Sequence, residues 1–143
     1  GILGDVSGCA GHGGDREAAA VAATVLARAR RNLGEYELAE RAIDEAIQLA
    51  VPVGGDTLAD AHLAAASIAS FRQNASRTAF HHDEAERHGS PALQLDVSIQ
   101  RAVIAEFEGR LDEAVALYEI AIGRLDAEGN EACICTRAPD PLG

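Results

Sequence analysis

The stretch HHDEAERH, residues 81–88, gathers several potential metal ligands in one short segment. Imidazole and carboxylate groups can hold one ion when they stand three or four residues apart on a helix. That spacing joins His82 to Glu86 and Glu84 to His88, and it joins no histidine to another. The first and last histidines of the stretch are about two helical turns apart, which is too far for one small ion. We therefore predict no metal site, and we expect a half-buried His82 among solvated neighbours.

The cysteines are candidates for a nucleophile, a metal ligand or a disulfide. There are three, Cys9, Cys133 and Cys135, and an odd number near the two ends is not a disulfide framework, which favours a reducing compartment. One residue separates Cys133 from Cys135, whereas a zinc knuckle has two. His12 lies close to Cys9, but a nucleophile and its base need a third group to orient them, and none is near. We predict neither a catalytic nor a metal or redox role for these side chains.

Two other patterns have structural explanations. The glycine-rich segment GDVSGCAGHGG lacks the lysine of a phosphate-binding loop and follows no strand. Asp112 and Glu113 form a carboxylate pair in the first turn of an expected helix, where they complement the helix dipole. With no assembled nucleophile and base, we expect a protein that is not an enzyme and that needs no cofactor.

The composition narrows the class of partner. The formal net charge is −11, all 12 basic residues are arginine, and the chain has two Tyr, three Phe and no Trp. A nucleic-acid surface usually needs a basic patch and stacking aromatics, so we expect a protein or peptide partner and no nucleic acid. No apolar run approaches the roughly 18 residues of a membrane span, so we expect no membrane segment and a cytoplasmic location. The bias towards alanine, arginine and glycine is typical of a bacterial source.

Glycine, proline and apolar periodicity divide the 143 residues into six expected helices. Asp15 is expected to cap the first of them, and Ser90 followed by Pro91 is a clear start signal for the fifth. No segment alternates with a period of two, so we expect no strands. The glycine-rich segment 1–14 is expected to be flexible, and the tail 131–143 irregular or truncated. The expected helices span residues 16–32, 35–50, 57–71, 76–88, 91–107 and 111–127.

Two stretches of the chain are nearly the same: LGEYELAERAIDEAI starts at Leu33, and EGRLDEAVALYEIAI starts at Glu108. The glycine permits a tight turn between helices, and the small alanine lets the second helix approach the first. A larger apolar residue follows four positions later, and helix pairs that cannot bury this face alone must stack. The matched positions, all 75 residues apart, are Gly34 with Gly109, Ala39 with Ala114, Ile43 with Tyr118, and Ala46 with Ala121.

This pattern resembles the tetratricopeptide repeat (TPR) family over residues 15–130. The resemblance implies an all-α fold, a TPR-like superhelix or α-solenoid of about three antiparallel helix pairs. Thr78 and His82 fall near the small and large positions of the middle pair, whose turn lacks a glycine, so its register stays open by one residue. Residues 99–130 also resemble the repeats of actinobacterial proteins with a CHAT peptidase domain, and the helical-repeat regions of bacterial transcriptional regulators. The chain starts without methionine, and we expect it to be part of a longer protein.

In the family that the chain resembles, the first helix of each pair lines a concave groove. The resemblance therefore implies a protein–protein interaction scaffold that binds a peptide or a partner helix without chemistry. The alternative is a ligand-sensing region of a transcriptional regulator, and the sequence leaves the oligomeric state open. The Lys/Asn clamp that some members use for carboxylate tails is missing. The implied groove positions are Thr24, Arg28 and Arg31 in the first pair, Leu63, Ser67 and Ser70 in the second, and Ile99, Val103 and Glu106 in the third.

Overall fold

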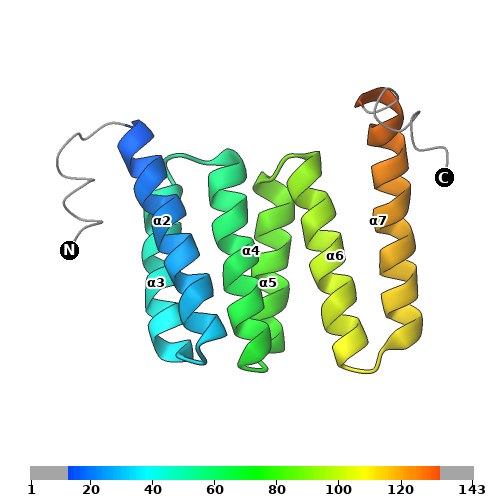
Figure 1. The fold of residues 1–143 in the computed structure, drawn as a ribbon, viewed down its shortest axis with the longest axis horizontal. Helices are drawn as coiled ribbons and strands as arrows, with labels where there is room; N and C mark the ends of the chain where they lie inside the picture. Colours follow the sequence, from blue (N-terminus) through cyan, green and yellow to red (C-terminus); the bar gives the residue numbers. More distant parts are fainter. Residues whose placement is uncertain (1–12, 133–143) are drawn as a thin grey trace. The chain divides into compact units, whose positions relative to one another are not determined.

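The computed structural model describes the backbone of residues 13–132 and the side chains of residues 14–125. Within the described backbone there are six α helices and no strand, which confirms the prediction of an all-helical chain (Figure 1). The chain divides into two compact units, Gly1–Val97 and Ser98–Gly143, with the boundary inside the fifth helix. The helices are α2 (Gly13–Asn32), α3 (Tyr36–Ala50), α4 (Gly55–Phe71), α5 (Ala75–His88), α6 (Pro91–Phe107) and α7 (Leu111–Ala132).

Three helices, α2, α4 and α7, begin or end two or more residues away from the sequence prediction. α2 begins at Gly13, so Asp15 lies in its first turn and complements the helix dipole instead of capping it. α7 continues to Ala132, because a single glycine inside a helix costs only about 1 kcal/mol and Gly129 does not stop it. Before α4, Gly54 takes a positive φ of 71° and provides no side-chain cap.

Asp56 in the first turn of α4 stabilises the start of a different helix. Its carboxylate accepts hydrogen bonds from the N–H and the hydroxyl of Ser90, at 2.7 and 2.9 Å. The Ser90 hydroxyl in turn accepts a bond of 3.4 Å from the N–H of Leu93, and Pro91 is the first residue of α6. The start signal read from Ser90 and Pro91 is therefore confirmed.

The three turns within the helix pairs have the same hydrogen bonds. In each, a residue with positive φ donates its N–H to the carbonyl three residues earlier, and the next residue donates to the carbonyl five residues earlier. This is the usual glycine-favoured end of a helix. The positive-φ residues are Gly34 (81°), Gln73 (59°) and Gly109 (81°). Because the turns match, the repeat steps are 39 and then 36 residues, and the register of the middle pair is fixed.

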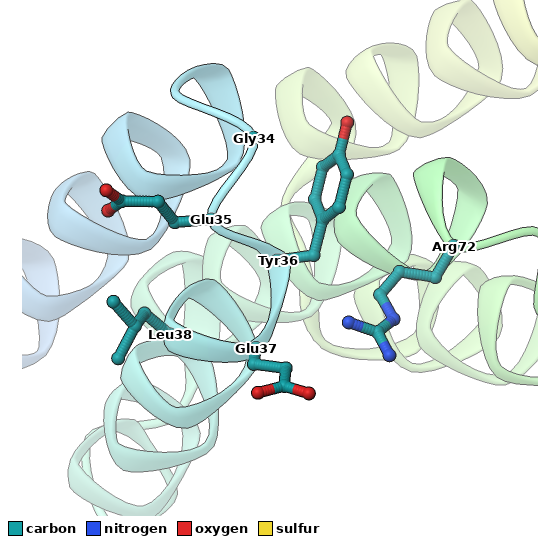
Figure 2. A pocket seen from close by; sticks show the side chains of 6 residues that line it. All are labelled: Gly34, Glu35, Tyr36, Glu37, Leu38 and Arg72. Carbon is teal, nitrogen blue, oxygen red and sulfur yellow. The ribbon is translucent and has the colours of Figure 1, made fainter.

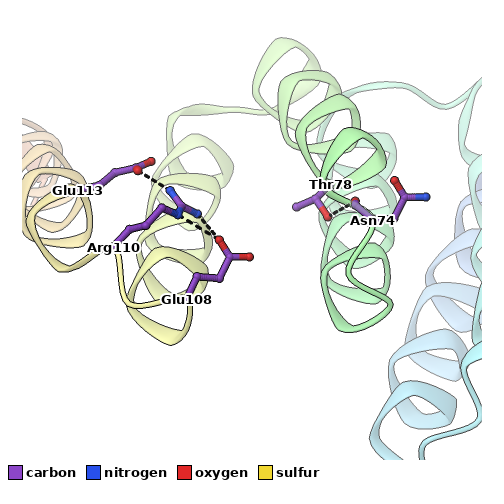
Figure 3. A network of polar contacts seen from close by, with 5 residues as sticks. All are labelled: Asn74, Thr78, Glu108, Arg110 and Glu113. Carbon is purple, nitrogen blue, oxygen red and sulfur yellow. Dashed lines mark hydrogen bonds and ion pairs between the residues drawn. The ribbon is translucent and has the colours of Figure 1, made fainter.

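This register places Thr78 and His82 at the positions of Ala39 and Ile43, as the sequence predicted. The middle turn has its own support, since Asn74 accepts the N–H of Arg77 at 3.1 Å on its side chain and the Thr78 hydroxyl at 2.8 Å on its carbonyl. Figure 3 shows the bond between Thr78 and Asn74.

The turn between α6 and α7 carries an ion-pair network (Figure 3). Arg110 donates from Nη2 and Nε to Glu108 at 2.5 and 3.1 Å, and from Nη1 to Glu113. Glu113 thus both complements the dipole of α7 and pairs with an arginine one turn earlier. These contacts raise the pKa of Arg110, first through the hydrogen bond to Glu113 and then through that to Glu108.

The core of the first unit is built mostly from alanine. Helix α2 packs along α3, and both contact α4, which packs along α5. Small side chains allow this close approach, and the largest fully buried side chains are only Ile43, Ile68 and Val97. A second cluster joins Leu63 of α4 to Ala85 of α5 and Val97 of α6.

In the second unit, two hydrogen bonds join α6 to α7. The Tyr118 hydroxyl donates to Glu106 at 3.0 Å, and Arg124 donates to the Ser98 hydroxyl at 3.2 Å. Ala114 and Ala121 on α7 are buried, as the repeat pattern requires of the small positions. Among the described helices, none has both the length and the apolar character needed to cross a bilayer.

Candidate functional site

The implied groove positions of the first unit differ widely in exposure. Three of them are buried: Thr24 is 3% exposed, Leu63 6% and Ser67 7%. The Thr24 hydroxyl donates to the carbonyl of Ala20 at 2.8 Å, so its polar group is already satisfied within α2. These three side chains contribute to the helix packing and present little surface to a partner. The remaining three, Arg28, Arg31 and Ser70, are half-buried.

Arg28 forms a bidentate ion pair with Asp60 of α4. Its Nη2 lies 2.9 Å from Oδ1 of Asp60 and its Nη1 lies 3.2 Å from Oδ2. The geometry is the fork that arginine forms with a carboxylate, and the Arg28 side chain remains 32% exposed. The positive charge at this implied groove position is therefore balanced within the chain.

Arg31 makes a second link between α2 and α4. Its guanidinium donates to the Ser67 hydroxyl and to the side chain of Asn32, and it lies 5.5 Å over the ring of Phe71. The Phe71 ring stacks on Tyr36 at a centroid distance of 6.0 Å. Burial lowers the pKa of Arg31, and the charge of Arg28 lowers it further, although arginine stays charged at neutral pH. Both arginines thus hold neighbouring helix pairs together.

A shallow hollow of about 370 Å³ lies beside this stack, open to solvent. Figure 2 shows Tyr36 and Glu37 at the start of α3, with Arg72 approaching from the end of α4. Arg72 also contacts Glu40, with 3.5 Å between Nε and Oε2, and Glu35 is paired with Arg30 at 2.6 Å. The hollow can contribute charge and an aromatic face to binding. Its six lining residues, Gly34, Glu35, Tyr36, Glu37, Leu38 and Arg72, include no serine, cysteine or histidine.

The histidines of α5 are more buried than the sequence predicted. His81 is 5% exposed and His82 3%, so the expectation of a solvated His81 and a half-buried His82 was wrong. For His81 the reason is His62 on α4, whose Nδ1 lies 2.9 Å from Nδ1 of His81. Burial, and after it the charge of nearby His62, lowers the pKa of His81 to about 4; burial also lowers the pKa of His62.

The spacing that joined Glu84 to His88 corresponds to a real contact. His88 Nε2 lies 3.5 Å from Glu84 Oε1, and the His88 ring stacks on His62 at 6.4 Å. In the described part of the chain, no group of three or more His, Cys, Asp or Glu side chains is arranged to hold a metal ion. The sequence predictions for Cys9, His12, Cys133 and Cys135 lie outside the described residues.

The groove positions of the second unit are more accessible. Ile99 is 40% exposed, Glu106 is exposed, and Val103 is half-buried. Glu106 accepts the Tyr118 hydroxyl, which fixes its carboxylate near α7. This part of the first-helix face is therefore apolar with one acidic end.

Sequence reasoning missed Asp60, Phe71 and His62, which partner Arg28, Arg31 and His81. All three partners lie on α4, whereas the residues that they contact lie on α2 and α5, so only the packing of α4 reveals the pairings. Comparisons with protein-family models, with curated proteins and with solved structures gave no match.

Proposed function

We propose that the protein is an interaction scaffold, a TPR-like α-solenoid that binds a peptide or a partner helix on the first helices of its pairs. The observation that carries the proposal is the threefold recurrence of one turn, at Gly34, Gln73 and Gly109. The recurrence supports an equivalent face on each of the helices α2, α4 and α6. Repeated helix pairs present such faces as extended binding surfaces.

The burial pattern refines which residues contact the partner. Thr24, Leu63 and Ser67 maintain the packing, whereas Ile99 offers apolar surface on α6. Contact is then dominated by Ile99 and Val103, with Glu106 favouring a basic group on the partner. A short amphipathic helix with apolar side chains and a flanking arginine or lysine has this chemistry.

The assignment of no enzymatic activity belongs to the same proposal. His62 and His81 are hydrogen-bonded to each other, and Arg28 and Arg110 form ion pairs with carboxylates. These groups have structural partners in the described residues, and we assign them to helix packing. Binding of this kind requires surface and charge complementarity and no bond rearrangement.

The test is capture of a partner from bacterial lysate by the immobilised full chain and by two variants. Ile99→Asp places a charge on the proposed face. Ile120→Asp is the control, because Ile120 is also exposed, at 50%, and the equivalent position in α3 is Glu45. Charge reversal at the groove arginines, Arg28→Glu with Arg31→Glu, is a less suitable test, since it breaks the links between α2 and α4.

A partner held by the wild type and by Ile120→Asp, and released by Ile99→Asp, is the expected result. A partner held equally by all three chains contradicts the assignment of the face. The absence of any captured protein contradicts the scaffold function itself. Circular dichroism of each variant confirms that the helices remain intact.

A further inference from the structure

The face that α3 turns towards α4 shows how this chain joins one helix pair to the next. At one end of α3, Tyr36 stacks on Phe71, and Glu40 lies 3.5 Å from Arg72. Farther along, Ile43 is buried in the shared core, and Ile47 packs against it. The face therefore consists of α3 positions separated alternately by four and three residues: Tyr36, Glu40, Ile43, Ile47 and Ala50.

Helix α7 carries the same face in a more apolar form. Adding the repeat distance of 75 residues gives Leu111, Val115, Tyr118, Ile122 and Leu125. Four of these five are exposed, by 59%, 55%, 57% and 52% for leucine, valine, isoleucine and leucine in turn, and Tyr118 is half-buried. A stripe with this alternating spacing is the seam along which one helix packs against another.

Helix α2 carries the complementary face. In α4, the side chains at positions 61, 64, 65 and 68 are buried in the core that α4 shares with α3. Subtracting 39 residues gives their counterparts in α2, which are apolar and exposed: Ala22, Val25, Leu26 and Ala29. Val25 is 57% exposed and Leu26 41%. The chain thus has an uncovered α3-like face on α7 and an uncovered α4-like face on α2.

We propose that α7 of one copy of this chain packs against α2 of a second copy, in the way that α3 packs against α4 within each chain. Such head-to-tail contact is heterologous, because two different surfaces meet. At the position of the Glu40–Arg72 ion pair, it brings Val115 against Leu33, which is 71% exposed. An apolar contact replaces the ion pair there, so no buried charge opposes association.

The alternative pairing of two α7 helices fits less well. It would set the large side chains Leu111, Ile122 and Leu125 against copies of themselves. In the contact between α3 and α4, by contrast, branched side chains meet alanines such as Ala61 and Ala65. Ala22 gives α2 a small side chain at the position of Ala61, and Ala29 adds a second at the position of Ile68; small side chains allow two helices to approach closely.

The experiment measures mass against concentration for the full chain by sedimentation equilibrium. Val25→Glu blocks the α2 face and Ile122→Glu blocks the α7 face. Ile120→Glu is the matched control, because Ile120 lies on α7 outside the stripe and Glu45 occupies its counterpart in α3. The wild type and the control are expected to rise above the 14.9 kDa of one chain, while each blocked variant alone stays there.

Mixing the two blocked variants gives the decisive result. Each retains one intact face, so an equimolar mixture forms a species of two chains and no larger one. A wild type that keeps the mass of one chain at every concentration overturns the proposal. Association by Val25→Glu alone also overturns it, because that outcome indicates pairing between two α7 helices.

Folding is checked separately by circular dichroism. All substituted sites are exposed, so the helical signal of each variant should match the wild type. If either variant loses helix, Leu26→Glu and Leu125→Glu repeat the same test on the same two faces. Ile99 lies on neither face, so the Ile99→Asp variant should still self-associate even where it no longer binds the partner. The two proposals can therefore fail independently.

Discussion

Nδ1 of His62 on α4 lies 2.9 Å from Nδ1 of His81 on α5, and both rings are buried. One ring must donate its N–H while the other offers a lone pair, so the bond requires an unprotonated acceptor. Protonation of the acceptor Nδ1 would leave two N–H donors facing each other. The bond therefore links the packing of α4 on α5 to the protonation of the two histidines.

We predict that acid destabilises the protein through His81. The folded-state pKa is about 4, below the usual 6.5, so between these values the unfolded chain binds more protons. The free energy of unfolding should fall as the pH drops from 6.5 towards 4, by about 1–2 kcal/mol after discounting for residual solvation. The charged groups that act on this ring are His62, Arg77, His82 and Glu84, and only Glu84 opposes the shift.

Urea unfolding at a series of pH values measures this effect, with His81→Asn as the control. Asparagine retains a hydrogen-bonding group near Nδ1 and does not titrate. Its free energy of unfolding should change less over this pH range than that of the wild type. Parallel pH profiles for the two proteins would show that His81 is not the responsible group.

Gln73→Gly is expected to stabilise the protein. Gln73 is the non-glycine residue with positive φ in the described chain, and this left-handed conformation costs an L-residue about 1–2 kcal/mol. Glycine removes that cost, but the unfolded glycine chain gains about 0.5–1 kcal/mol of conformational freedom, which leaves a net stabilisation of up to about 1.5 kcal/mol. The urea midpoint should rise for Gln73→Gly and fall for the reverse change, Gly34→Gln. A lower midpoint for Gln73→Gly would contradict the equivalence of the turns.

Ala39→Leu and Ala114→Leu should each cost about 1–3 kcal/mol by overpacking. Ala39 is 0% exposed and Ala114 3%, so neither site has room for three more carbons. At the equivalent middle position Thr78 is half-buried, so Thr78→Leu should cause no overpacking and should cost about 0.5–1 kcal/mol through loss of the hydroxyl bond to Asn74. Thermal melts of the three variants decide the matter. Unchanged melts for both alanine variants would mean that the repeat register is wrong.

Gly89→Ala should destabilise the protein by about 1–3 kcal/mol for a steric reason. A Cβ at Gly89 would lie 2.7 Å from Cβ of Leu93 and 3.1 Å from Cβ of Ala59, although its φ of −87° suits any residue. Gly123→Ala is the control, because nothing lies within 4 Å of a Cβ there. That change should stabilise α7 by about 0.5–1 kcal/mol. Equal effects on the unfolding midpoint would argue against close packing at Gly89.

Local signals allowed most of the helices to be predicted. Periodicity, the glycines at 34 and 109, and Ser90 with Pro91 located the helices and the repeat, because they act within a few residues of the chain. The turn at Gln73 was harder, since its left-handed residue is not a glycine and the hydrogen bonds of its turn are visible only in the structure. Contacts between distant residues could not be predicted. Arg28 meets Asp60 across 32 residues, and His62 meets His81 across 19, and both contacts depend on how α4 is packed.

The alanine-rich core determines how the protein responds to mutation. A methyl side chain has almost nothing to delete, so systematic replacement by alanine would leave much of this interior unexamined. Substitutions that enlarge a buried side chain should destabilise this protein most. A survey that tests every amino acid at every position should therefore identify the buried sites as those where larger side chains are not tolerated. Tolerated substitutions at the buried alanine positions are then confined to glycine, alanine and serine. This restriction preserves the spacing of the helices, while residues on the surface can change.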